Sequence, residues 1–235
     1  MDKFVIQGGT PLIGEIKVSG SKNAALPLMA AALLGDSPSR IRNVPRLNDI
    51  YTFNKVIEVT GTSVRFNETD NELHIDPSGL NNPESPYDLV RKMRASFYML
   101  GALLSNSGHA KVSLPGGCAW GPRPVNLHIE GLKALGAEIH MEKGYVIAEA
   151  PGGRLRGGHF KLEPSSVGAT VNLILGAVKA TGRSVIENAA MEPDVVLLCE
   201  AMCQMGAVIG GIGTSTLTID GVDSLQGFDF RNSPD

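Results

Sequence analysis

The chain has 235 residues and a formal net charge of −3, and 28 of its residues are glycine. A chain of this length can bury a core of ordinary size in one or two domains, which excludes disorder as its main state. The nearly balanced charge gives no overall field that would attract nucleic acid or an anionic membrane. We therefore expect a folded protein without nucleic-acid or membrane partners, in which any anion site is local.

The first 20 residues contain two short runs that are typical of strands, residues 3–7 and residues 14–18. A pair of strands alone is marginally stable in water, so these two need a sheet to join. The start of the chain does not have the pattern of a signal peptide, and the longest apolar run, residues 24–34, is too short to cross a bilayer. These features predict a cytoplasmic protein.

A pattern that repeats three times follows, from about residue 20 to residue 221. In each copy an apolar helix leads to a strand, a second helix ends at a glycine, and two more strands follow. The glycines are Gly61, Gly136 and Gly206, about 70 to 75 residues apart. Helices that alternate with strands indicate α/β architecture. The strands with predicted bounds are residues 39–44, 72–75, 110–114, 145–148, 184–188 and 216–219.

The start of the first helix is the run Ser-Gly-Ser-Lys-Asn at residues 19–23. Free backbone N–H groups at a helix start, with Lys22 beside them, can bind a phosphate or a carboxylate. The same pattern is also that of an ordinary N-cap, in which a serine or an asparagine satisfies the first turn. The sequence alone leaves both interpretations open.

Equivalent helix starts occur in the second and third copies. Residues 91–96 form a basic cluster that includes Arg94, and residues 165–168 precede the apolar helix of the third copy. If the copies pack about a pseudo-threefold axis, the three helix starts converge on one anion-binding region. A basic face exposed to solvent is the alternative for the cluster.

The loop at residues 114–124 combines paired glycines and alternating prolines with Cys118 and Arg123. A guanidinium near a thiol lowers the thiol pKa and makes it a better nucleophile or proton donor. The alternative is a turn whose cysteine packs as a small apolar residue. Cys199 and Cys203, spaced four apart in an amphipathic run, are predicted to be buried core thiols. The histidines are scattered and no nucleotide-binding motif is present, so neither a metal nor a cofactor is expected.

Several motifs together resemble the UDP-N-acetylglucosamine enolpyruvyl transferases, which open bacterial peptidoglycan synthesis. They are residues 19–27, 86–90 with 93–96, 115–118 with 121–125, and 166–170. The resemblance implies an inside-out α/β barrel of the enolpyruvyl transferase type, with three repeats of helix, strand, helix, strand and strand about a pseudo-threefold axis. It also implies transfer of the enolpyruvyl group of phosphoenolpyruvate to the 3′-hydroxyl of UDP-N-acetylglucosamine.

The resemblance assigns roles to individual residues. Cys118 would be the general acid that protonates the enol methylene, and the target of epoxides of the fosfomycin type. Lys22, Asn23 and Arg123 would hold phosphoenolpyruvate. Pro164 stands where some members have lysine, so no basic contact is expected there. The residues implied to contact UDP-N-acetylglucosamine are Arg94, Arg123, Pro124, Val125, Asn126, Leu127, Ser166 and Val167.

Family members are longer chains with two similar domains that close on the substrates. By this resemblance, residues 1–20 supply strands to the other domain, residues 21–229 form the three-repeat domain, and residues 230–235 begin the linker. The second domain, with the general base, would be absent, so little turnover is expected from this chain alone. A noncatalytic ligand-binding domain of the same fold is an alternative. The shikimate-pathway transferase is another, disfavoured by the loop with Cys118.

Overall fold

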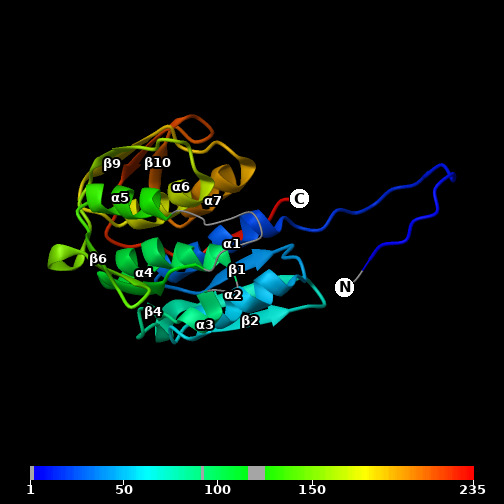
Figure 1. The fold of residues 1–235 in the computed structure, drawn as a ribbon, viewed down its shortest axis with the longest axis horizontal. Helices are drawn as coiled ribbons and strands as arrows, with labels where there is room; N and C mark the ends of the chain where they lie inside the picture. The colour runs from blue at the N-terminus through cyan, green and yellow to red at the C-terminus, as the bar shows by residue number, and fades with distance from the viewer. Residues whose placement is uncertain (1–2, 91–92, 116–124) are drawn as a thin grey trace.

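The computed structural model describes residues 3–90, 93–115 and 125–235, and for residue 94 the backbone alone. Within these residues the predicted unit occurs three times (Figure 1). The first unit comprises α1 (Lys22–Ala31), β1 (Ser39–Arg42), α2 (Asn48–Glu58), β2 (Ser63–Asn67) and β3 (Glu72–Asp76). The second comprises α4 (Met99–Ser107), β5 (His109–Ser113), α5 (Asn126–Ala134), β6 (Glu138–Glu142) and β7 (Tyr145–Glu149). The third comprises α6 (Val167–Ala177), β9 (Arg183–Glu187), α7 (Pro193–Gln204), β10 (Val208–Gly210) and β11 (Thr216–Asp220).

Short elements connect these units. The short strands are β4 (Glu84–Ser85), β8 (His159–Lys161) and β12 (Asp229–Arg231). The short helices are η1 (Ala32–Leu34), η2 (Pro77–Gly79), α3 (Tyr87–Val90), η3 (Arg94–Tyr98) and η4 (Pro151–Gly153). The repeat and the order of elements predicted within it are confirmed.

Each of the three sheets has four strands, one more than the predicted unit. Their orders are β12-β1-β3-β2, β4-β5-β7-β6 and β10-β11-β9-β8. The added strands β4, β8 and β12 each pair in parallel with the first strand of a unit, and the other pairs are antiparallel. Because β12 follows the third unit and joins the sheet of the first, the described chain closes on itself.

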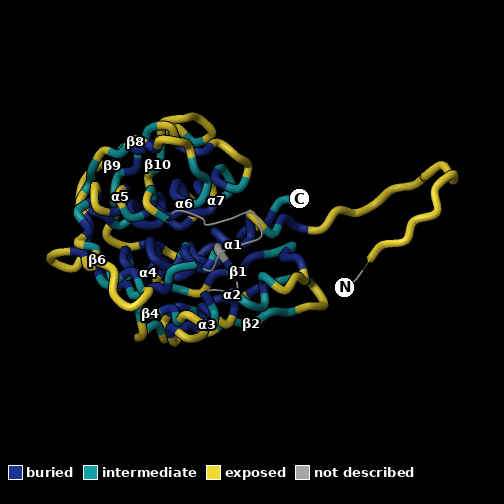
Figure 2. Tube along the Cα trace, in the orientation of Figure 1, coloured by how far each residue is buried: buried dark blue, intermediate teal, exposed yellow. Residues whose placement is uncertain are grey.

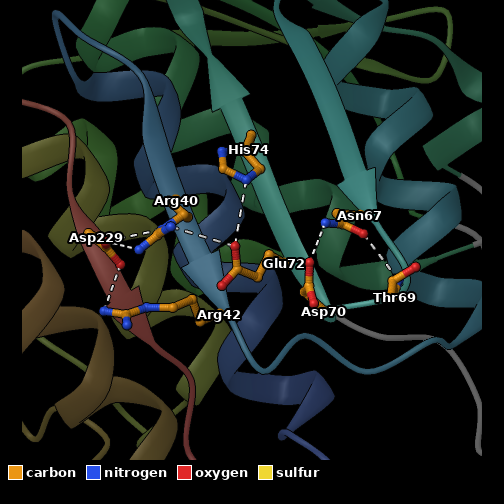
Figure 3. Close-up of polar contacts among 8 residues, drawn as sticks. All are labelled: Arg40, Arg42, Asn67, Thr69, Asp70, Glu72, His74 and Asp229. Atoms are coloured by element: carbon orange, nitrogen blue, oxygen red, sulfur yellow. Dashed lines mark hydrogen bonds and ion pairs between the residues drawn. The ribbon is translucent and has the colours of Figure 1, made fainter.

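Charged side chains stabilise this closure, in which residues 189 positions apart in the chain meet (Figure 3). Asp229 of β12 accepts hydrogen bonds from Arg40 Nε at 3.1 Å and Nη2 at 2.6 Å, and it pairs with Arg42 Nη2 at 2.8 Å. Glu72 lies 3.7 Å from the Arg40 guanidinium on the other side. The hydrogen bond from Arg40 is the main cause that lowers the pKa of Asp229. The charges therefore complement each other across three strands.

The first helix of each unit lies inside the molecule (Figure 2). Almost all residues of α1, α4 and α6 are buried, and these helices contact one another. They are apolar around their whole circumference, as expected of helices enclosed by other elements. The second helices, α2, α5 and α7, bury one face only. The inner strands alternate buried and exposed residues, because one sheet face covers the helices and the other meets solvent.

The three predicted helix-ending glycines adopt the conformation that requires glycine. The φ angles of Gly61, Gly136 and Gly206 are 91°, 87° and 105°. Residues with a Cβ rarely adopt such angles, so glycine allows the chain to turn from the helix into the next strand.

The N-terminal segment differs from the prediction. Residues 3–19 form no strand in the described structure and run as an exposed extended arm (Figures 1 and 2). The predicted strands at residues 3–7 and 14–18 are therefore not formed here, because neither run pairs with a strand of the described residues. The arm exposes large apolar side chains, with Phe4 98% and Leu12 97% exposed. Such a surface is typical of a segment that packs against another part of a protein.

Candidate functional site

The start of α1 is held by its cap and its close neighbours. Ser21 has extended backbone angles, and its hydroxyl accepts a hydrogen bond of 3.3 Å from the Ala24 N–H. A Cβ on Gly20 would lie 1.7 Å from the Asn43 carbonyl oxygen, so only glycine fits there. Asn232 donates to the Ser21 carbonyl at 2.8 Å. The N-cap interpretation is therefore correct for Ser21, and it fixes the backbone that carries the next two residues.

Those two residues remain accessible. Asn23 is exposed, and the Lys22 side chain is 37% exposed. Lys22 Nζ lies 2.9 Å from Asp49 Oδ2 in the first turn of α2. An exposed pair of this kind contributes about 0 to 1 kcal/mol, so an anionic ligand can replace Asp49 at little cost. Lys22 therefore offers a cation, next to the positive end of a helix, that a phosphate or carboxylate can reach.

The start of α6 uses the same type of cap. The Ser166 hydroxyl accepts a hydrogen bond of 3.3 Å from the Ala169 N–H, and Ser166 and Val167 are half-buried. Thr170 donates to the Ser166 carbonyl at 2.8 Å and accepts from the Ala190 N–H at 3.0 Å. The first turn of α6 is thus tied to the segment before α7.

Two of the three helix starts lie beside the start of α7. Helix α7 packs along α1 with Asp194 of its first turn near the side chain of Ser21, and the Ala190 N–H is hydrogen-bonded to Thr170 of α6. The third start is Arg94, the first residue of η3, and η3 contacts α1, α2 and α6. These contacts support the expected convergence of the three helix starts on one region.

Asp194 and Asp49 were not found by sequence reasoning. Burial, with Asp235 and Glu192 nearby, raises the pKa of Asp194. The available signal was the position of each aspartate in the first turn of a helix, where a carboxylate is favourable. Nothing in the sequence pairs them with the start of a different helix.

The loop that carries much of the predicted chemistry lies outside the described residues. This applies to Cys118, Arg123 and Pro124, and the side chain of Arg94 is also outside. The part that follows the loop is described. Val125 is the N-cap residue of α5, Asn126 is exposed, and Leu127 is half-buried against the core. The described end of this segment therefore combines an accessible polar residue with a helix start.

The other two cysteines differ from each other. Burial is the main cause that raises the pKa of Cys199 to about 12, so its thiol stays protonated, as predicted for a core cysteine. Cys203 is exposed, and the prediction that it is buried is wrong. It is spaced four residues from Cys199, but the helix turns enough to leave it at the edge of the buried face.

The described residues contain no group of three or more His, Cys, Asp or Glu side chains that could hold a metal ion. Within the same residues, no helix has the length and apolar character needed to cross a membrane.

Comparison with known proteins gives consistent results for sequence and structure. The chain is 49% identical over 235 residues to the UDP-N-acetylglucosamine 1-carboxyvinyltransferase of Cellvibrio japonicus (strain Ueda107), which covers 100% of this chain and 56% of that protein. It is 48% identical over 236 residues to UDP-N-acetylglucosamine 1-carboxyvinyltransferase 1 of Staphylococcus aureus (strain N315), with the same coverage of the two chains. The chain thus spans about half the length of the curated relatives it matches.

Solved structures show the same fold. The enolpyruvyl transferase NikO from Streptomyces tendae superimposes with a TM-score of 0.84 at 25% identity, over 97% of this chain and 53% of that one. An EPSP synthase from Acinetobacter baumannii superimposes with a TM-score of 0.74 at 17% identity, over 94% of this chain and 50% of that one. The predicted enolpyruvyl transferase fold is therefore confirmed. The family model described as EPSP synthase (3-phosphoshikimate 1-carboxyvinyltransferase) matches residues 6–235, and the chain belongs to this family.

Proposed function

We propose that the protein transfers the enolpyruvyl group of phosphoenolpyruvate to the 3′-hydroxyl of UDP-N-acetylglucosamine and releases phosphate. The observation that carries this proposal is the 49% identity over the whole chain to a UDP-N-acetylglucosamine 1-carboxyvinyltransferase. The likeness to EPSP synthase, at 17% identity, supports a shared fold alone. The product is a precursor of bacterial peptidoglycan, and we assign the reaction to the cytoplasm.

The reaction consists of an addition and an elimination. The sugar oxygen bonds to C2 of phosphoenolpyruvate while Cys118 gives a proton to C3, which forms a tetrahedral ketal. Loss of a proton from C3 and of phosphate from C2 then restores the double bond. Lys22, Asn23 and Arg123 hold the phosphate and carboxylate of phosphoenolpyruvate. The accessible ammonium of Lys22 at the start of α1 supports this role.

The second substrate, UDP-N-acetylglucosamine, contacts the starts of the other helices. Ser166 and Val167, half-buried at the start of α6, support such a contact because backbone N–H groups there attract a diphosphate. The exposed position of Asn126 at the start of α5 supports a second contact. The full set that we assign to this substrate is Arg94, Arg123, Pro124, Val125, Asn126, Leu127, Ser166 and Val167.

A further part of the protein completes the cleft. Residues 21–229 form the three-repeat domain, residues 1–20 add strands to a second domain, and residues 230–235 lead into it. The apolar side chains that the arm exposes support this role, because they need a partner to cover them. The general base that takes the proton from the sugar hydroxyl belongs to that second domain.

The test is phosphate release from phosphoenolpyruvate and UDP-N-acetylglucosamine. We expect little turnover from the 235-residue chain alone, and turnover when the C-terminal part of the Cellvibrio japonicus relative is supplied, because closure and the base both contribute to the transition state. Cys118→Ser in this reconstituted protein should abolish turnover. Fosfomycin should add its mass to the unsubstituted chain but not to the Cys118→Ser chain.

Three results would each contradict part of the proposal. Near-normal turnover by the chain alone would show that no second domain is needed. Failure of the reconstituted protein to release phosphate, together with failure of the chain to bind the UDP-sugar, would reject the assigned substrates. Preference for shikimate 3-phosphate would instead favour the reaction of the aromatic pathway.

A further inference from the structure

Asn172 is a fully buried polar residue in the middle of the apolar helix α6. Its exposed fraction is 0%, and its neighbours in the helix are buried apolar residues. Burial of an amide is unfavourable unless its polar atoms are hydrogen-bonded. Its partners lie in η3, α4 and α5, so Asn172 links α6 to three other elements.

The partners fix the orientation of the amide. The Gly101 backbone N–H donates to Asn172 Oδ1 at 2.7 Å, and Asn172 Nδ2 donates to the Phe97 carbonyl at 3.0 Å. The reverse orientation would place an NH₂ group against an N–H and an oxygen against a carbonyl. The amide therefore has one possible orientation, and it joins α6 to both η3 and α4.

The second hydrogen of the same NH₂ group reaches α5. Asn172 Nδ2 lies 2.7 Å from Nδ1 of His128, a residue that is 3% exposed. Because the amide orientation makes Nδ2 the donor, Nδ1 accepts, and a neutral ring then carries its proton on Nε2. The imidazole also packs edge-on against Phe97, with 5.1 Å between ring centroids and 79° between ring planes.

Close backbone approach makes this arrangement rigid. A Cβ on Gly101 would lie 2.4 Å from the Asn172 carbonyl oxygen, so α4 and α6 meet where no other residue fits. A Cβ on Gly131 of α5 would lie 2.5 Å from the Leu173 side chain of α6. Small movements of α5 or η3 relative to α6 would therefore break the hydrogen bonds or create clashes.

Three of the four linked elements begin with residues that, in the proposed function, contact the UDP-sugar. These residues are Arg94 for η3, Asn126 for α5, and Ser166 with Val167 for α6. We propose that Asn172 is a positioning residue, which through His128, Phe97 and Gly101 sets the distances between these three helix starts. This inference rests on the proposed function for the identity of the ligand, but the coupling of the three starts is independent of it.

Asn106 provides a matched control. Its side-chain NH₂ group donates to the Leu33 carbonyl, so it also links two buried helices through an amide and a backbone carbonyl. This link lies after the last turn of α1 and near the end of α4, away from the helix starts. Asn172→Leu and Asn106→Leu therefore remove the same kind of interaction at opposite ends of the helices.

The experiment measures binding of UDP-N-acetylglucosamine to the 235-residue chain by calorimetry, and backbone amide chemical shifts by NMR. Asn172→Leu should weaken binding about tenfold or more, because misplaced contacts lose most of their value. It should also shift the amide signals of Arg94, Asn126 and Val167. Asn106→Leu should lose stability but bind as the unsubstituted chain does, with those signals unchanged.

A second pair of variants tests the link through His128 if Asn172→Leu fails to fold. His128→Asn keeps an acceptor close to the position of Nδ1 and should bind UDP-N-acetylglucosamine as the unsubstituted chain does. His128→Leu should weaken this binding about tenfold. Equal loss in both variants, or equal loss in Asn106→Leu and Asn172→Leu, would overturn the positioning role. If the unsubstituted chain binds no UDP-sugar and the reconstituted protein releases no phosphate, but the amide signals shift as expected, the proposed function is wrong and the positioning role stands.

Discussion

The starts of α1 and α6 are two versions of the same local structure. In each, a serine hydroxyl accepts a 3.3 Å hydrogen bond from the N–H three residues later. Their surroundings differ, because α1 begins with a lysine paired to Asp49 and has Asp194 near its cap. The cap of α6 contacts the neutral Thr170. The repeat therefore gives α1 and α6 the same N-cap. We expect the side chains next to each cap to decide which ligand that helix start can bind.

The largest effect should follow from removing the positive charge of Lys22, which the start of α1 has and the start of α6 lacks. In the reconstituted protein, Lys22→Met should lower kcat/KM for phosphoenolpyruvate about 100-fold or more, because a charged contact to the reacting group is lost. Phosphate release measures this. Asp49→Asn is the control, since it removes the partner of Lys22 and keeps the cation. If Asp49→Asn is as harmful as Lys22→Met, the ion pair and not the free cation is what the reaction needs.

The second-largest effect should follow from removing the serine N-cap that the starts of α1 and α6 share. Ser21→Ala and Ser166→Ala should each lower the free energy of unfolding by about 1 kcal/mol, because each removes an N-cap. Urea denaturation of the 235-residue chain measures this.

The matched controls are Ser21→Gly and Ser166→Gly, which should lose only a few tenths of a kcal/mol because glycine is tolerated at an N-cap. Ser21→Ala and Ser166→Ala should lose similar stability, but each should weaken the binding of a different ligand. We expect Ser21→Ala to weaken phosphoenolpyruvate binding and Ser166→Ala to weaken UDP-sugar binding. Loss of the same ligand in both variants would contradict the division of roles between the two helices.

Periodicity was enough to predict most of the fold. Apolar helices, alternating strands and the helix-ending glycines are local patterns, and all three copies were found from them. The fourth strands β4, β8 and β12 were missed because each has only two or three residues and exists through pairing with a distant partner. In contrast, residues 3–7 and 14–18 of the arm were predicted as strands from local pattern alone. Its residues favour extended structure, but a strand also needs a neighbour.

For the candidate site, too, sequence patterns predicted local features but not contacts between separate helices. An N-cap at the start of α1 was one of the two interpretations that the local motif allows, and the apolar run that follows residues 165–168 placed the start of α6. The contacts of these starts with Asp49 and Asp194 depend on how separate helices pack, which no local pattern encodes. The same holds for Asn172, which in sequence is a single polar residue inside an apolar run.

The smallest effect is a pH dependence of stability that the start of α1 should show and the start of α6 should not. Burial raises the pKa of Asp194, which lies near the cap of α1. The folded chain therefore binds more protons than the unfolded chain between the ordinary value, about 3.9, and the raised value. The free energy of unfolding should fall as pH rises through this window. Asp194→Asn removes the effect, so its stability relative to the unsubstituted chain should increase over the same range.

Asp220 gives a control of opposite sign, because a hydrogen bond from Arg183 lowers its pKa. Its stabilisation is present above the ordinary pKa and is lost as pH falls through the lowered value. Asp220→Asn should therefore lose stability relative to the unsubstituted chain as pH rises, where Asp194→Asn gains. Thermal unfolding between about pH 3 and pH 7 measures both. The same trend in both variants would show that overall charge, and not the environment of Asp194 at the start of α1, governs the response.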